Sequence, residues 1–342
     1  QEHRTALDKR NRQAYYRMVH ADRLLPCKLE DANKAIDQFM INKKANMDPA
    51  TNARWVAKKF NMELIHLPML AIPLFRIPDT KDASGLPASQ QATVGAAILL
   101  ACSAAGDLQA TLQILNAVYY SSNGYNIPLA AKIARYYSPN DINNCKKTLQ
   151  KLAEGEDGKA GATGDANAMT LHGKFLELEG KTQEARYFYD KAVEKYDLKV
   201  HRGYPHPMAL PWLTPWMAFV SLERSQPEPS HAKIKQALEF GALKADDPLA
   251  YYQLATLQQE KTPTWLAYMN KAAASGHVEA MYTLGKFYIS VGEQPSSYLK
   301  ANFEKAFNFM MYRKDGGPSH LGIEWLRAAG LGGHREALDE LA

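Results

Sequence analysis

The sequence predicts an all-α fold, in which an α-solenoid of antiparallel helix hairpins follows a non-repeat helical N-terminal part. Its periodic segments place apolar residues at i, i+3 and i+4, and none sustains the alternation of a β-strand. One short pattern also recurs along the second half of the chain, which is the signature of a repeat array. With 342 residues, 46% hydrophobic and 23% charged, the chain is typical of folded proteins and long for one compact core.

Proline and glycine divide the chain into three parts. We expect a helical segment of two or three helices over residues 1–65, a Pro-rich linker over residues 66–91, and a helical-repeat solenoid over residues 92–342. A second Pro-rich stretch predicts an insertion near residues 199–216 of the solenoid. The apolar run of residues 92–105 is shorter than the roughly 20 residues that cross a bilayer, so it predicts a buried helix and no membrane span.

The repeat can be seen by direct comparison. Residues 164–175 match residues 276–287 at six of twelve positions without a gap, and residues 268–285 align in the same way with residues 325–342. A Gly and an Ala four residues apart recur through these copies, with Asp246 in place of the Gly in one of them. The repeat positions to which we assign a structural role are Gly164, Ala168, Gly173, Ala250, Gly276, Ala280, Gly285, Gly333 and Ala337.

Helix geometry explains the residue types at these positions. Glycine ends a helix because it adopts the left-handed C-cap conformation without steric strain. The next helix then begins near Glu279 or Glu336, where an acidic side chain favours the helix dipole. Small residues such as Ala280 and Gly285 allow a neighbouring helix to approach closely. One such hairpin cannot bury its apolar face alone, so stacked hairpins are expected.

The copy over residues 268–288 contains an aromatic residue, Lys-Ala-Ala, Gly-His, Ala and Leu-Gly in that order, and so resembles the Sel-one-like repeat. Residues 325–342 resemble the same motif, and residues 173–192 resemble the plainer tetratricopeptide repeat. The alanines at 110, 168, 250, 280 and 337 are unevenly spaced, which requires insertions or degenerate units. The resemblance implies a non-catalytic adaptor, scaffold or assembly factor. It brings no catalytic, cofactor-binding or metal-binding residues.

Other chemistry is poorly supported by the residues. His201 and His206 lie in a Pro-rich stretch without the i, i+4 spacing of a helical metal pair. His277 and His334 recur at one repeat position, which favours a structural role at the turn. The three cysteines, Cys27, Cys102 and Cys145, show no paired spacing. No phosphate-binding loop, nucleophile elbow or zinc-protease motif is present, so an enzyme with its site in the N-terminal part is the weakest of three alternatives.

Aromatic residues of the insertion are our candidates for partner binding. Tyr204, Trp212 and Trp216 lie there, and Trp and Tyr are common anchors at protein interfaces. The competing interpretation is that the tryptophans begin the next helix and pack inward. Tyrosine pairs such as Tyr119-Tyr120 could also line a groove for a peptide. The partners we expect are other proteins within a larger complex.

The charge pattern leaves one further alternative open. The net charge is only +5 with a pI near 8.8, and basic residues are interspersed with acids rather than gathered in a block. An organellar RNA-associated repeat protein, with Lys and Arg on phosphates and Tyr on bases, is therefore the second hypothesis. Basic residues up to Arg23 would suit a mitochondrial protein. They suit an ordinary basic helix of a cytoplasmic protein at least as well.

Overall fold

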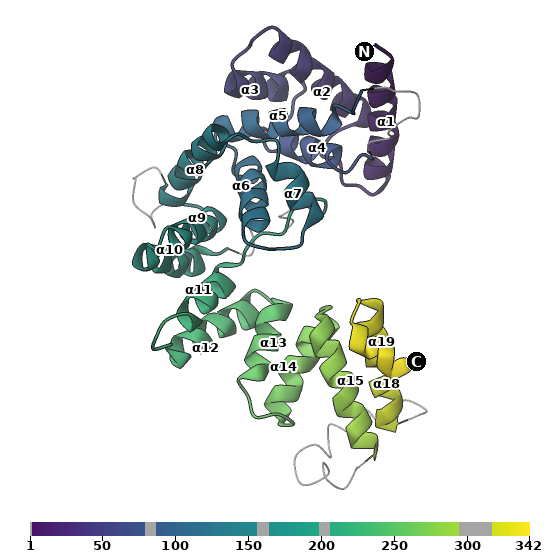
Figure 1. Cartoon of the computed structure of the whole chain (residues 1–342), viewed down its shortest axis with the longest axis vertical. Helices are drawn as coiled ribbons and strands as arrows, with labels where there is room; N and C mark the ends of the chain where they lie inside the picture. Colours follow the sequence, from purple (N-terminus) through teal and green to yellow (C-terminus); the bar gives the residue numbers. More distant parts are fainter. Residues whose placement is uncertain (1, 79–86, 156–163, 198–205, 294–316) are drawn as a thin grey trace. The chain divides into compact units, whose positions relative to one another are not determined.

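The computed structural model describes residues 2–78, 87–155, 164–197, 206–293 and 317–342. These residues form helices and connecting turns without a β-strand, so the all-α prediction is confirmed. The chain forms two compact units: unit 1 is Gln1–Ala218, and unit 2 is Phe219–Ala342 (Figure 1). Both expected domain limits, at residues 65 and 91, therefore lie inside unit 1.

Unit 1 begins with three helices over the segment where two or three were expected, and then continues through eight more. They are α1 (Glu2–Ala21), α2 (Leu29–Lys44), α3 (Pro49–Lys59), α4 (His66–Leu74), α5 (Gln91–Ala104), α6 (Leu108–Ser122), α7 (Pro128–Ala134), α8 (Pro139–Glu154), α9 (Ala166–Leu178), α10 (Thr182–Lys195) and α11 (Pro215–Arg224), the last of which extends into unit 2. The predicted buried helix of residues 92–105 is α5, and most of its residues are inaccessible to solvent.

The first part of the expected linker is not a linker, because residues 66–74 form the buried helix α4. Leu67, Leu70 and Leu74 are almost completely buried, and α4 packs against α5. Pro68 lies in the first turn of α4, where a backbone N–H has no intrahelical partner to lose. Pro73 lies next to the last residue. Burial of the apolar residues outweighs the proline penalty at these terminal positions. Residues 79–86 lie outside the described residues.

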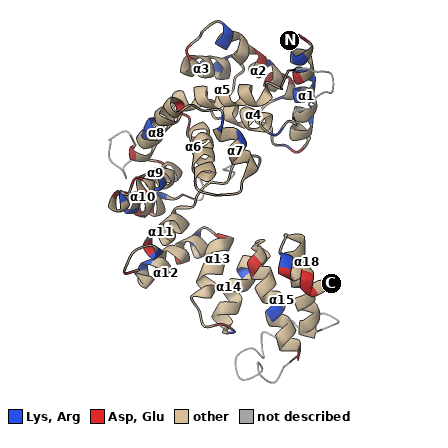
Figure 2. Cartoon of the chain, viewed as in Figure 1, with Lys and Arg blue, Asp and Glu red and all other residues tan. Residues whose placement is uncertain are grey.

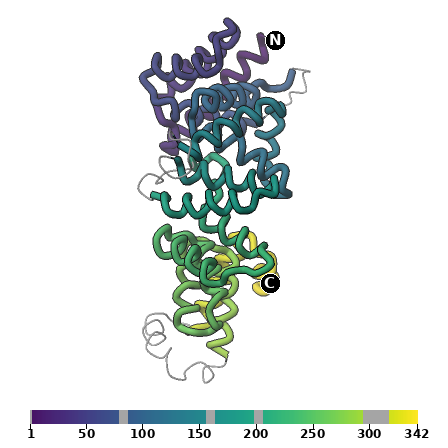
Figure 3. The backbone as a smooth tube through the Cα atoms, turned by 90° about the vertical axis from the view of Figure 1, so that its left-hand side faces the viewer, coloured from purple at the N-terminus to yellow at the C-terminus, as the bar shows by residue number. Residues whose placement is uncertain are grey.

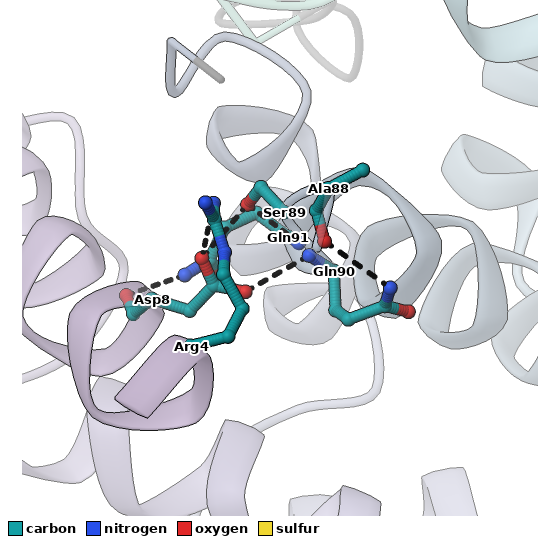
Figure 4. A network of polar contacts seen from close by, with 6 residues as sticks. All are labelled: Arg4, Asp8, Ala88, Ser89, Gln90 and Gln91. Atoms are coloured by element: carbon teal, nitrogen blue, oxygen red, sulfur yellow. Dashed lines mark hydrogen bonds and ion pairs between the residues drawn. The ribbon is translucent and has the colours of Figure 1, made fainter. Parts of the chain in front are cut away.

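A polar network fastens α1 to the start of α5 (Figure 4). The buried carboxylate of Asp8 forms an ion pair with Arg4 at 2.7 Å. It also accepts hydrogen bonds from the Ser89 hydroxyl at 3.0 Å and the Gln90 backbone N–H at 2.8 Å. The Gln91 side chain donates to the Asp8 carbonyl. The N-terminal helix is thus an integral part of unit 1.

Unit 2 contains α12 (His231–Glu239), a short π-helix η1 (Phe240–Lys244), α13 (Pro248–Thr256), α14 (Pro263–Ala274), α15 (Val278–Glu293), α18 (Gly317–Leu331) and α19 (Arg335–Leu341). The pairs α13–α14, α14–α15, α15–α18 and α18–α19 pack together, and Figure 3 shows the helices of this unit side by side. Leu326, Ala329 and Ala337 form a small core between the last helices.

The repeat alanines occupy one structural environment. Ala110, Ala168, Ala250, Ala280 and Ala337 each have no exposed surface. Each alanine lies three positions after a residue whose side chain caps the start of the helix. These caps are Asp107, Asp165, Asp247, His277 and His334, which accept hydrogen bonds from backbone N–H groups of the first turn at 2.7–3.3 Å.

The residue before each cap shows why glycine recurs there. Gly276 and Gly333 have φ of 95° and 92°, and Asp246, which replaces glycine in its copy, has φ of 53°. His277 and His334 donate their backbone N–H groups to carbonyls five residues earlier, as a Schellman helix end requires. Gly164 differs, because its role is close approach: a Cβ there would lie 1.9 Å from the Ala153 carbonyl oxygen.

The two repeat histidines, His277 and His334, make the same contacts at their turns. The His277 ring stacks on Tyr252 at 4.3 Å between centroids, and the His334 ring stacks on Tyr282 at 4.2 Å. In each case Nδ1 is the acceptor that caps the following helix, so this nitrogen carries no proton. The structural interpretation of these residues is therefore supported by their contacts.

Gly173 and Gly285 permit helices to approach closely. Gly173 lies in α9 and Tyr189 in α10, and a Cβ at Gly173 would lie 2.5 Å from the Tyr189 ring. A Cβ at Gly285 would lie 2.7 Å from the side chain of Leu326 and 3.0 Å from the carbonyl oxygen of Gly322 in α18. The backbones of α15 and α18 thus nearly touch at two glycines.

Candidate functional site

Residues 206–214, which we call the strap, are the part of the predicted insertion that the structure describes before α11 begins at Pro215. They form no helix and lie in unit 1. The strap begins at the buried His206, whose Nδ1 accepts a hydrogen bond from the Met208 backbone N–H at 3.2 Å. Its Nε2 therefore carries the proton and donates to the Leu24 carbonyl at 2.9 Å. This geometry explains His206 as a structural residue.

The strap is held through its own backbone by side chains of α6 and of the turn that follows α4. Arg76, which follows α4, donates to the Met208 carbonyl at 3.0 Å. The Gln113 side chain of α6 accepts from the Leu210 N–H at 3.1 Å. Two turns further along α6, the Tyr120 hydroxyl donates to the Pro211 carbonyl at 2.9 Å. Burial raises the pKa of Tyr120 to about 12, which keeps this hydroxyl protonated as a donor.

Few strap side chains take part in this binding. His206 and Leu210 are buried, whereas the other strap residues are exposed or partly exposed. Leu210 has 1% of its surface exposed, so it is the apolar anchor of the segment. Residues 206–209 form a turn, in which the Ala209 N–H donates to the His206 carbonyl at 2.7 Å, and residues 210–214 follow without a turn or a helix. Backbone hydrogen bonds and the buried Leu210 side chain thus hold the strap, as they hold many bound peptides.

Under the strap, α6 carries three buried amide side chains, which we call the amide stripe: Gln109, Gln113 and Asn116. They are spaced i, i+4, i+7 and therefore share one face of the helix. Each has only 1% of its surface exposed. Among the described residues, both polar atoms of the Gln109 side chain, Nε2 of Gln113 and Oδ1 of Asn116 lack hydrogen-bond partners. Each such group costs about 1–3 kcal/mol of desolvation.

A second feature of unit 1 is an open pocket of about 240 Å³ between α8, α9 and α10. Leu149, Phe175, Leu176 and Phe188 supply its apolar surface, and Lys146, Lys147, Gln150, Glu154, His172, Glu179, Lys181 and Glu184 supply its polar surface.

The charged groups of this pocket largely interact with one another and with its aromatic rings. Lys146 lies over the ring of Phe175 at 4.5 Å, and Lys181 forms an ion pair with Glu179 at 2.9 Å. The hydrogen bond from Lys181 lowers the pKa of Glu179. His172 contacts the ring of Phe188 edge-on at 4.7 Å, and burial lowers its pKa. The pocket can hold an apolar side chain under a rim of mixed charge.

The aromatic residues proposed from sequence lie in different environments. Tyr204 lies outside the described residues. Trp212 lies in the strap and is partly exposed. For Trp216, one of the partner-binding candidates, the structure shows a buried side chain. Its indole is 2% exposed and packs edge-to-face against Tyr196 at 4.9 Å, because the side chain points inward at the start of α11. The competing interpretation, in which it packs inward, is the one the contacts support.

The residues that hold the strap were mostly missed by sequence reasoning. The pair Tyr119-Tyr120 marks Tyr120 as a candidate, whereas Arg76 and the amide stripe belong to none of the patterns considered above. One signal was available: α6 is otherwise rich in apolar residues, and three amides recur there at helical spacing. Such a pattern predicts a buried polar face. What it contacts could not be known without the strap, which is about 90 residues further along the chain.

Some classes of site find no support in the described parts of the chain. No group of three His, Cys, Asp or Glu side chains there is arranged to hold a metal ion, and the three cysteines are free thiols. No helix in these parts combines the length and the apolar character needed to span a bilayer. The chain matches no protein-family model, and no curated protein is significantly similar to it.

Proposed function

We propose that the chain is a non-catalytic protein-binding scaffold, adaptor or assembly factor, whose unit 1 binds extended segments of polypeptide. The observation that carries this proposal is the docked strap. The side chains of Arg76, Gln113 and Tyr120 bind backbone N–H and C=O groups of a segment without helical structure. A surface that recognises backbone groups can accept many sequences, as an adaptor requires.

The proposal includes a helical-repeat architecture of the Sel-one-like and tetratricopeptide kind, stacked as an α-solenoid. Its support is the recurrence of one turn geometry in both units: a capping residue followed three positions later by a fully buried alanine. Residues with left-handed φ precede four of the five caps. Recurrent turns of this kind place successive helix pairs in register, which is how solenoids build continuous binding faces.

The charge distribution favours protein partners over RNA. In Figure 2, basic and acidic residues are interspersed along the described helices of each unit rather than separated onto different elements. Several of the lysines form ion pairs, including Lys174 with Glu177 and Lys286 with Glu340. Binding to RNA through phosphates requires a continuous basic track of free cations.

Affinity purification of the tagged full chain tests this function. We expect specific proteins to be recovered, to persist after nuclease treatment, and to persist between low and physiological salt. A photo-reactive residue at the exposed Ser121 of α6, next to Tyr120, should crosslink to a partner more than one at the exposed Lys58 of α3. Recovery that disappears with nuclease or falls steeply with salt would transfer the assignment to the RNA-associated alternative.

We also propose a mitochondrial location for the protein, with the cytoplasm as the alternative. The basic residues of α1 that suggested it have structural partners. Arg4 pairs with Asp8, and Arg12 pairs with Asp37 and Asn33. These contacts favour the interpretation as an ordinary basic helix. Cell fractionation with markers for both compartments decides between the two.

A further inference from the structure

The strap has the properties of a replaceable occupant. Three of its contacts with the rest of unit 1 are made by its backbone, at Met208, Leu210 and Pro211, and these do not depend on side-chain identity. Its one buried apolar anchor is Leu210. A segment of another chain with an apolar residue followed by proline could present the same backbone groups to the same side chains.

The amide stripe is better equipped for binding than the strap requires. The strap uses Oε1 of Gln113, but polar atoms of Gln109 and Asn116, one turn to either side, remain unpartnered. These side chains are more than nine-tenths buried and lie on the helix face that contacts the strap. Buried polar groups in folded proteins nearly always have partners, so unpartnered ones indicate a ligand or water that completes them.

We propose that the face of α6 that carries the amide stripe is the binding site for a non-helical, uncharged segment of a partner protein, and that the strap is an internal competitor that leaves when this segment binds. The segment has an apolar residue at the position of Leu210, followed by proline, and its backbone pairs with Gln109 and Asn116 in addition to Gln113. This inference rests on the proposed function and specifies the site and the partner chemistry.

Tethering determines how strongly the strap competes. A segment joined to its site by a short connection has an effective concentration on the order of millimolar. A free peptide of the same sequence at micromolar concentration should therefore bind poorly to the native chain. Loosening the strap should increase the apparent affinity for the free peptide, by roughly 10- to 100-fold where its own affinity is micromolar, because the competent fraction rises.

The probe is a fluorescent peptide with the sequence of residues 206–216, titrated into the full chain and followed by anisotropy. Leu210→Ser loosens the strap without altering Gln113 or Tyr120 of α6, and His206→Ala is a second loosening variant that changes only the strap, because it removes the hydrogen bond to the Leu24 carbonyl. We expect weak binding to the native chain and at least 10-fold tighter binding to Leu210→Ser. Binding should be lost when Gln113→Ala is added. A peptide that carries Ser at the position of Leu210 should not bind.

Circular dichroism first establishes that each variant keeps its helical content. Tyr119→Phe is the control, because it removes a hydroxyl from the adjacent tyrosine, whose ring packs against Phe175 of α9. The proposal is overturned if folded, loosened chains fail to bind the peptide at millimolar concentration. It is also overturned if binding is unchanged by Gln113→Ala. Recovery of protein partners by affinity purification, together with absent peptide binding, would retain the scaffold function and reject the strap as competitor.

Discussion

The crossing of α15 and α18 provides a sharp test of the packing in unit 2, through two Gly→Ala substitutions in the same helix. A Cβ at Gly322 would lie 2.7 Å from the Gly285 carbonyl oxygen and 2.8 Å from the Ile289 backbone nitrogen. A Cβ at Gly330 would instead meet the end of the Leu338 side chain at 2.8 Å, and Leu338 is 52% exposed and free to turn.

These geometries predict opposite signs. In a helix interior, replacement of glycine by alanine favours the helix by about 1 kcal/mol. At Gly322 the extra methyl group meets backbone atoms of α15, which cannot rotate away, so the helices must separate at a cost of about 1–3 kcal/mol. We expect a net destabilisation of about 1–2 kcal/mol for Gly322→Ala, because contacts under 3.0 Å with backbone lie at the costly end of that range. Gly330→Ala should be neutral or slightly stabilising, by up to about 1 kcal/mol.

Hydrogen–deuterium exchange of the full chain measures the effect of both substitutions in the helices concerned, α15 and α18. Gly322→Ala should accelerate exchange in α15 and α18, leave α2 and α5 of unit 1 unchanged, and lower the thermal midpoint of unit 2 by about 3–10 °C. Gly330→Ala should slow or preserve exchange in α18. If both variants behave like the parent, or if Gly330→Ala is the more damaging, the close approach of the two helices is wrong.

Three further predictions concern helix ends and buried charge. Gly276→Ala should destabilise the α14–α15 turn by about 1 kcal/mol, because its φ of 95° is strained for alanine even though the site has space for a methyl group. An unchanged midpoint of urea unfolding would contradict this prediction. Asp8→Ala should loosen α1 by about 3 kcal/mol, because it removes a buried partner of Arg4; limited proteolysis should then cleave α1 faster, and equal cleavage rates would refute it. Burial lowers the pKa of His277, so below about pH 6.5 the unfolded chain binds more protons than the folded chain. The unfolding free energy should therefore fall from about pH 7 to 5, and His277→Asn, which can still cap Ala280, should flatten this dependence; equal slopes would show that His277 does not titrate in this way.

The sequence by itself determined the features that depend on near neighbours in the chain. Helical class follows from periodicity, and the turns at Gly276 and Gly333 follow from the need for a left-handed residue before a capping side chain. The buried alanines could be predicted in the same way, because each recurs one turn inside its helix, where a small residue allows a neighbouring helix to approach closely.

Only the tertiary structure decided the features that depend on distant segments. Residues 66–74 contain two prolines and still form a helix, because α5 buries their apolar side chains. Trp216 packs inward on Tyr196 instead of serving as a surface anchor. The candidate site arises where Leu210 and Pro211 meet Gln113 and Tyr120, some 90 residues earlier in the chain. Local propensity carries no information about such pairings, because their free energy comes from desolvation and hydrogen bonds that exist only after the chain has folded.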